Sequence, residues 1–174
     1  MRPSTRLEDA EDSASFRQTV AQFATGVTVI ATESGGPVHA MTANSFTSLS
    51  LSPPLVLFCA GKQTKMCARV READRFAVNI LARGQEDISS YFAGAWKQPE
   101  PPPFSFETWA AVPRLAGCAG VLACDVHAVH EGGDHWIVIG RVVDVVRPDP
   151  PVIPLVICGG RYAGLEERTA SLSA

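Results

Sequence analysis

Residues 121–146 read VLACDVHAVH EGGD HWIVIGRVVDVV. The residues on either side of the central EGGD are rich in β-branched side chains, which favour extended strands. Two adjacent glycines, Gly132 and Gly133, lie between them, and glycine is the residue that tight hairpin turns favour. We therefore expect residues 121–130 and 135–146 to form two long antiparallel strands joined by a turn at 131–134.

The rest of the chain indicates further short strands and few helices. We expect strands at 26–32, 37–41, 55–60, 75–81 and 155–158, and helices at 13–25, 61–73 and 85–92, with a proline-rich surface excursion at 98–103. No series of alternating strand–helix–strand units and no GxGxxG or P-loop motif is present, which argues against a doubly wound nucleotide-binding fold. The expected fold class is mainly β with a few helices, namely a closed or nearly closed antiparallel barrel with helices packed outside.

Length and composition narrow the class of protein. A chain of 174 residues fits one domain, and we expect a flexible segment at 1–12 and a single domain at 13–174. Fifteen basic and eighteen acidic side chains, a net charge of -3, argue against nucleic-acid binding. No signal-peptide pattern and no apolar run near the ~20 residues of a membrane span is present, so we expect a cytoplasmic protein without a membrane partner.

The cysteines do not indicate a disulfide framework or a metal site. The chain has five, at positions 59, 67, 118, 124 and 158, an odd number with no CxxC pair and no Cys/His ligand spacing. We therefore expect free thiols and no bound metal.

The segment 42–52, TANSFTSLSLS, is rich in hydroxyl and amide side chains but has neither charge nor glycine. Short neutral donors of this kind can surround a polar ligand without adding bulk or charge. The alternative is an edge strand whose hydroxyl groups simply face solvent, and the residues alone do not decide between the two.

Two further positions are candidate binding or catalytic residues. Gly61-Lys62-Gln63-Thr64 lies between a buried strand and a helix, where free backbone N–H groups and the lysine can hold a phosphate. His135 begins a strand directly after a turn and can donate a hydrogen bond to a ligand. The alternatives are simple helix capping with a solvated lysine, and a histidine without a function.

The order of several motifs resembles a known family. They are GVTVI at 26–30, HAMTANSFTSLSLSPPLVL at 39–57, FAVNIL at 76–81, GDH at 133–135, GRV at 140–142, PLV at 154–156 and GRY at 160–162. From about Phe16 to Tyr162 the chain resembles the flavin reductase domain family, the small reductase components of two-component flavin-dependent monooxygenases.

The resemblance implies a fold and an activity. The fold would be a split, Greek-key-like antiparallel β-barrel that forms a homodimer, with the flavin in a groove at or near the subunit interface. The activity would be reduction of FMN or FAD by NADH or NADPH, with hydride passing from nicotinamide C4 to flavin N5. The reduced flavin would then reach a separate flavin-dependent monooxygenase.

The resemblance also implies site residues. Residues 42–50 would surround the isoalloxazine ring and ribityl chain, residues 59–64 would lie beside the phosphate, and His135 would be the catalytic residue near the nicotinamide. The cofactor-binding set is Met41, Thr42, Ala43, Asn44, Ser45, Ser48, Ser50, Cys59, Ala60, Gly61, Lys62 and Thr64. Ala40 replaces a glycine of many members, and residues 62–66, KQTKM, replace a more serine-rich loop, so the sequence leaves FMN and FAD open.

Two other functions remain compatible with the sequence. One is a flavoprotein that passes electrons from a tightly bound flavin to a different acceptor. The other is a flavin-binding sensor or carrier that is not an enzyme.

Overall fold

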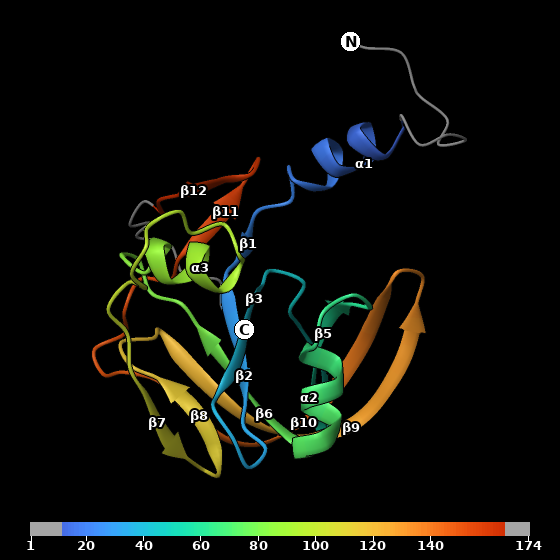
Figure 1. The fold of residues 1–174 in the computed structure, drawn as a ribbon, viewed down its shortest axis with the longest axis vertical. Coiled ribbons are helices and arrows are strands. Elements are labelled where there is room, and N and C mark those ends of the chain that lie inside the picture. Colours follow the sequence, from blue (N-terminus) through green and yellow to red (C-terminus); the bar gives the residue numbers. More distant parts are fainter. Residues whose placement is uncertain (1–11, 166–174) are drawn as a thin grey trace.

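The computed structural model describes residues 12–165, whose main element is a strongly curled seven-stranded sheet (Figure 1). The strand order is β3 (His39–Ala43), β2 (Thr28–Thr32), β6 (Arg75–Ile80), β9 (Gly120–Gly132), β10 (His135–Val146), β5 (Pro54–Gly61) and β4 (Thr47–Leu51). All neighbouring strands are antiparallel, as expected from the sequence. Residues 1–11 and 166–174, which include most of the segment expected to be flexible, lie outside the described part.

The hairpin predicted at 121–146 is confirmed and is tighter than expected. Gly132 pairs with His135, so the turn consists of Gly133 and Asp134 alone. Gly133 has φ +67°, the backbone conformation that a glycine at the first central position of a two-residue turn supplies. The register of β9 and β10 shifts at two places along β10, and such irregularities let long strands bend into a barrel.

The barrel is nearly closed because the two edge strands follow each other in the chain. β3 and β4 lie at opposite edges of the sheet, yet only residues 44–46 separate them. A connection this short forces the sheet to curl until its edges approach each other, as Figure 1 shows.

The N-terminal helix ends earlier than the sequence analysis predicted. The helix α1 spans Asp12–Val20, because residues 25–26 form a short strand, β1 (Thr25–Gly26), that pairs with β11 (Val156–Cys158). The first strand of the main sheet therefore begins at Thr28 rather than at Gly26. β12 (Arg161–Ala163) completes this small second sheet.

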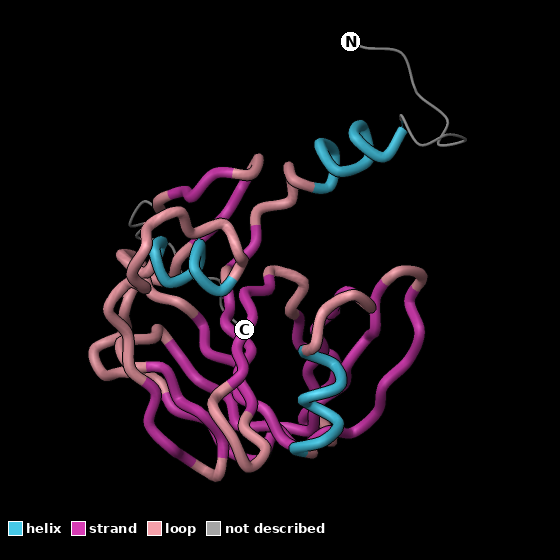
Figure 2. Tube along the Cα trace, in the orientation of Figure 1, coloured by secondary structure: helices cyan, strands magenta, loops and turns pink. Residues whose placement is uncertain are grey.

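One hairpin was not expected from the sequence. It consists of β7 (Phe106–Trp109) and β8 (Val112–Leu115), and follows the long loop after α3 that Figure 2 shows. The turn residues Ala110 and Ala111 have φ +48° and +59°, a conformation that normally selects glycine or asparagine. Because alanines occupy the turn, the usual hairpin signal was absent from the sequence.

Two helices cover opposite faces of the sheet. α2 (Met66–Ala73) closes the barrel interior together with residues such as Phe58 and Phe76. α3 (Glu86–Phe92) packs outside, over a second apolar cluster that includes Val29 and Leu81. Every residue of β2 is buried because both of its faces are covered. None of the helices among residues 12–165 is long and apolar enough to cross a membrane.

Asn79 links three strands inside this fold. Its side-chain N–H groups donate to the carbonyl oxygens of Val29 (3.1 Å) and Pro113 (3.4 Å), and its Oδ1 accepts from the Leu115 N–H (2.8 Å). The amide is fully buried, so each of these bonds satisfies a polar group that water cannot reach. Asn79 is therefore a structural residue.

Gly140 leaves no space for a side chain in the barrel interior. A Cβ atom added there would lie 2.4 Å from Phe76 Cζ and 3.0 Å from Cys124 Cβ. We predict that Gly140→Ala lowers the free energy of unfolding by about 1–3 kcal/mol, because the buried Phe76 ring must move.

Urea denaturation measures this effect, with Gly36→Ala in an exposed turn as the control. At Gly36 only the Ser34 carbonyl oxygen lies as near as 4.0 Å, so a change within about 0.5 kcal/mol is expected there. Equal stabilities of the two variants would contradict the packing described for Gly140.

Candidate active site

Ser45 joins the connection between the edge strands to the end of β5. Its Oγ accepts a hydrogen bond from the Cys59 N–H and lies at donor distance from the Cys59 carbonyl oxygen, both at 3.1 Å. The hydroxyl-rich segment and the Cys59–Thr64 segment, separate in the sequence analysis, therefore meet at one end of the barrel.

The same end of the barrel holds His135. In the β10–β5 register His135 lies opposite Gly61, and the Lys62 N–H donates to the Asp134 carbonyl oxygen over 2.9 Å. A Cβ atom added to Gly61 would lie 3.7 Å from Thr64 Cγ2 and 3.9 Å from His135 Nε2. Gly61 thus leaves space between the loop and the imidazole ring.

The His135 ring is oriented by its neighbour in the turn. Its Nδ1 lies 2.7 Å from Asp134 Oδ1, and this hydrogen bond holds the pKa of the Asp134 carboxyl below its ordinary value. With Nδ1 donating to the carboxylate, Nε2 is left to face a ligand, as an acceptor in the neutral ring and a donor in the protonated one. The ring is half exposed, so a ligand can reach it.

The loop after β5 is shaped by Thr64. Both its N–H (2.9 Å) and its Oγ1 (2.8 Å) donate to the Gly61 carbonyl oxygen, which folds residues 61–64 into a turn before α2. Lys65 occupies the N-cap position of α2 and makes no side-chain capping bond. The first N–H groups of α2 are therefore left without a side-chain cap, as a phosphate site requires.

Two side chains contact Lys62. Its Nζ lies 3.5 Å from Glu131 Oε1 and 5.0 Å from the centroid of the Trp136 ring. Glu131 is 70% exposed, and an ion pair in water holds its partner only weakly. The ammonium group is therefore available to an anionic ligand.

Cys59 contributes a neutral surface to the site. Burial raises the pKa of its thiol, so the group stays protonated at neutral pH. Together with the uncharged Asn44 and Ser45, it gives this part of the site neutral polar groups, and Arg17 of α1 is the charged residue that lines the adjoining pocket.

Several residues expected at the site have side chains elsewhere. Met41, Ala43 and Ala60 belong to the core between the sheet and α2, so only their backbone can meet a ligand. The Thr42 hydroxyl donates to the Ser89 carbonyl oxygen of α3 over 2.7 Å.

Ser48 and Ser50 lie further along the edge strand. Ser48 pairs with Val56, which precedes Cys59 by three residues, or about 10 Å along a strand. Ser50 pairs with Leu55 beyond a register shift. The structure does not bring either residue next to His135.

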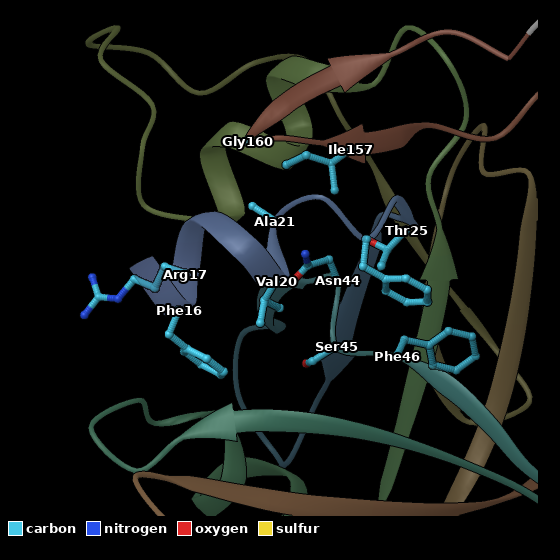
Figure 3. A pocket seen from close by; sticks show the side chains of 11 residues that line it. Phe16, Arg17, Val20, Ala21, Thr25, Asn44, Ser45, Phe46, Ile157 and Gly160 are labelled. Carbon is cyan, nitrogen blue, oxygen red and sulfur yellow. The ribbon is translucent and has the colours of Figure 1, made fainter. Parts of the chain in front are cut away.

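A pocket of about 480 Å³, not expected from the sequence, lies beside Asn44 and Ser45. Figure 3 shows Phe16 and Val20 of α1 on one side of it and Ser45 and Phe46 on the other. The helical spacing of Phe16, Val20 and Phe23 is the signal that could have identified it, because these side chains, on α1 and just after it, are 53%, 53% and 76% exposed. Trp136 beside Lys62 was also missed.

Known proteins of one family share this sequence and fold. An NADH-dependent FAD reductase from Streptomyces globisporus is 39% identical over 165 residues, covering 92% of this chain and 90% of that protein. An NADH-dependent flavin reductase from Rhodococcus sp is 41% identical over 154 residues, covering 87% and 85%.

Solved structures of flavin reductases have a similar fold. The flavin reductase PheA2 superposes with a TM-score of 0.84 at 38% identity, covering 90% of this chain and 99% of that chain. The NADH:FAD oxidoreductase SgcE6 of Streptomyces globisporus C-1027, in complex with NAD and FAD fragments, gives 0.83 at 35% identity, covering 95% and 100%. The sequence pattern of the flavin reductase like domain matches residues 20–166. The chain belongs to the flavin reductase like domain family.

Proposed function

We propose that this protein is an NADH-dependent flavin reductase that uses FAD and supplies the reduced flavin to a separate monooxygenase. The observation that supports this most directly is the meeting of Ser45, the 61–64 loop and His135 at one end of the barrel. Relatives named as NADH-dependent FAD and flavin reductases and as monooxygenase reductase subunits agree with the proposal.

The residues of this site fit a flavin. Asn44 is exposed and makes no side-chain hydrogen bond within residues 12–165, so its amide is free for a ligand. Neutral groups lie on the Asn44–Cys59 side and a cation lies at Lys62, which matches an uncharged ring that carries a phosphate chain.

Each part of the site has a distinct role. A bound flavin supplies a hydride acceptor at N5, opposite C4 of the nicotinamide. Asn44 and Ser45 hydrogen-bond the ring edge and ribityl chain, and the N–H groups at the start of α2, with Lys62, hold the phosphate. His135, fixed by Asp134, forms a hydrogen bond to the nicotinamide through Nε2 and orients it, which places the reacting atoms within reach of each other.

A second copy of the chain would complete the site. On β5 and β10 the side chains of Val56, Phe58 and Val138 face the core, while the alternate positions Leu57 and Ile139 form an apolar outer face. On the edge strand β4, Leu51 is 94% exposed. Apolar surface of this kind, exposed at Leu51 and partly exposed at Leu57 and Ile139, favours association, and Gly61 and His135 lie on the same outer face. The proposed homodimer therefore places the flavin beside the interface.

The dimer is tested by sedimentation velocity. We expect the unmodified protein to be a dimer and Leu57→Lys to be a monomer, because a charge would be buried in the interface. Ala68→Lys, on the exposed side of α2, is the control and should remain dimeric. A dimeric Leu57→Lys variant with native far-UV circular dichroism would contradict this interface.

The catalytic role is tested at His135. We predict that His135→Ala lowers the rate of NADH oxidation about tenfold, the loss of one hydrogen bond at the reacting groups, with flavin affinity within about twofold. The matched control is His127→Ala, an exposed histidine on β9. Stopped-flow absorbance measures the rate, and an unchanged rate would remove His135 from the mechanism.

The phosphate role is tested at Lys62. Lys62→Ala should weaken FMN binding about tenfold and riboflavin binding less than about twofold, because only FMN carries the phosphate. Quenching of flavin fluorescence measures both affinities, and Lys97→Ala in the exposed loop is the control. Equal losses for the two ligands would exclude the phosphate contact.

The function itself is tested by following NADH absorbance after addition of FAD or FMN. Oxidation that requires added flavin supports the proposal. A protein that binds flavin but leaves NADH unchanged would instead be a carrier or sensor, and turnover only with another acceptor would indicate a different electron-transfer partner.

A further inference from the structure

Trp136 brings two cationic side chains together beside the 61–64 loop. The tryptophan lies on β10 directly after His135 and is partly buried against the barrel core. Lys62 Nζ is 5.0 Å from its ring centroid, and Arg71 Cζ is 4.6 Å from the same centroid. Because both cations lie close to the same ring, they are within about 10 Å of each other.

Arg71 extends this positive charge along α2. It lies five residues after Met66, in the last turn of the helix, which is about 7.5 Å further along the axis. Arg71 has no acidic partner among residues 12–165, whereas Arg69 pairs with Glu72 and Arg75 pairs with Asp125. A guanidinium held against an indole ring has lost part of its rotamer freedom, so it binds an anion at a lower entropic cost.

We propose that Lys62 and Arg71, held against Trp136, bind the diphosphate of FAD and so make this protein select FAD over FMN. FMN carries one phosphate, which the 61–64 loop and the start of α2 can hold. FAD carries a second phosphate further from the ring, and the planar guanidinium of Arg71 suits two oxygen atoms of such a group. The inference rests on the proposed flavin reductase function.

Trp136 acts in this arrangement as a positioning residue. Its ring fixes where Lys62 and Arg71 lie, and it is not required to contact the flavin. The exposed ion pair of Lys62 with Glu131 is weak enough for a phosphate to replace it.

The affinities of FAD and FMN for the full-length apoprotein, measured by isothermal titration calorimetry, test the proposal. We expect the unmodified protein to bind FAD at least about tenfold more tightly than FMN. Arg71→Gln should weaken FAD binding about tenfold and FMN binding less than about twofold. Arg69→Gln, on the same helix two residues away but on its other side, is the control and should leave the FAD/FMN ratio unchanged.

Two variants of Trp136 distinguish the loss of its positioning role from a general loss of stability. Trp136→Phe keeps an aromatic face and should retain most of the FAD preference, whereas Trp136→Leu should lose it. Because the ratio of two affinities is compared within each variant, a general loss of stability that lowers both affinities does not imitate the result.

Several outcomes would overturn the inference. They are equal losses of FAD and FMN affinity in Arg71→Gln, an equal effect of Arg69→Gln, or a preference of the unmodified protein for FMN. If NADH is still oxidised with added flavin in these cases, only the FAD assignment fails. If the unmodified protein binds neither flavin and leaves NADH unchanged, the proposed function fails with it.

Discussion

The three-residue connection between β3 and β4 is the constraint on which the site depends. It joins strands at opposite edges of one sheet, so the sheet must close on itself, and Ser45 ties the closure to the backbone of Cys59 at 3.1 Å. The β4–β5 register, in which Thr47 pairs with Leu57, continues to Ser45 and Cys59, and the short connection brings the end of β3 to the same place. The short connection that curls the sheet therefore also brings the end of β3 to the candidate active site.

The polar side chains of the chain divide into two groups with different roles. The hydroxyl of Thr42 and the amide of Asn79 satisfy buried backbone groups of neighbouring elements. Asn44 and His135, at exposed ends of strands, keep donors or acceptors that face outward. Burial separates these groups, because a polar atom removed from water must bond within the protein, whereas an exposed one remains free for a ligand.

Charge in the candidate site is distributed unevenly from one end of the proposed ligand to the other. Asn44, Ser45 and Cys59 are neutral, and cationic groups gather where the 61–64 loop meets α2 and Trp136. A flavin nucleotide has the same polarity, with an uncharged ring at one end and phosphate at the other. The charge pattern of the site therefore fits the proposed ligand. The apolar outer face of β5 and β10, which carries His135, is where we propose that the second subunit binds.

The sequence by itself determined the elements whose signals are local. The β-branched runs and the glycine turn of 121–146 identified the central hairpin, and the sequence with its family resemblance predicted that residues 42–50, 61–64 and 133–135 bind the ligand. Tertiary structure alone decided what depends on distant partners. Pairing of residues 25–26 with β11 ends α1 early, and the alanine turn at 110–111 hides a hairpin. The contact of Trp136 with Arg71 likewise joins residues far apart in the chain, because the pairing of β10 with β5 and the packing of α2, and no local pattern, bring them together.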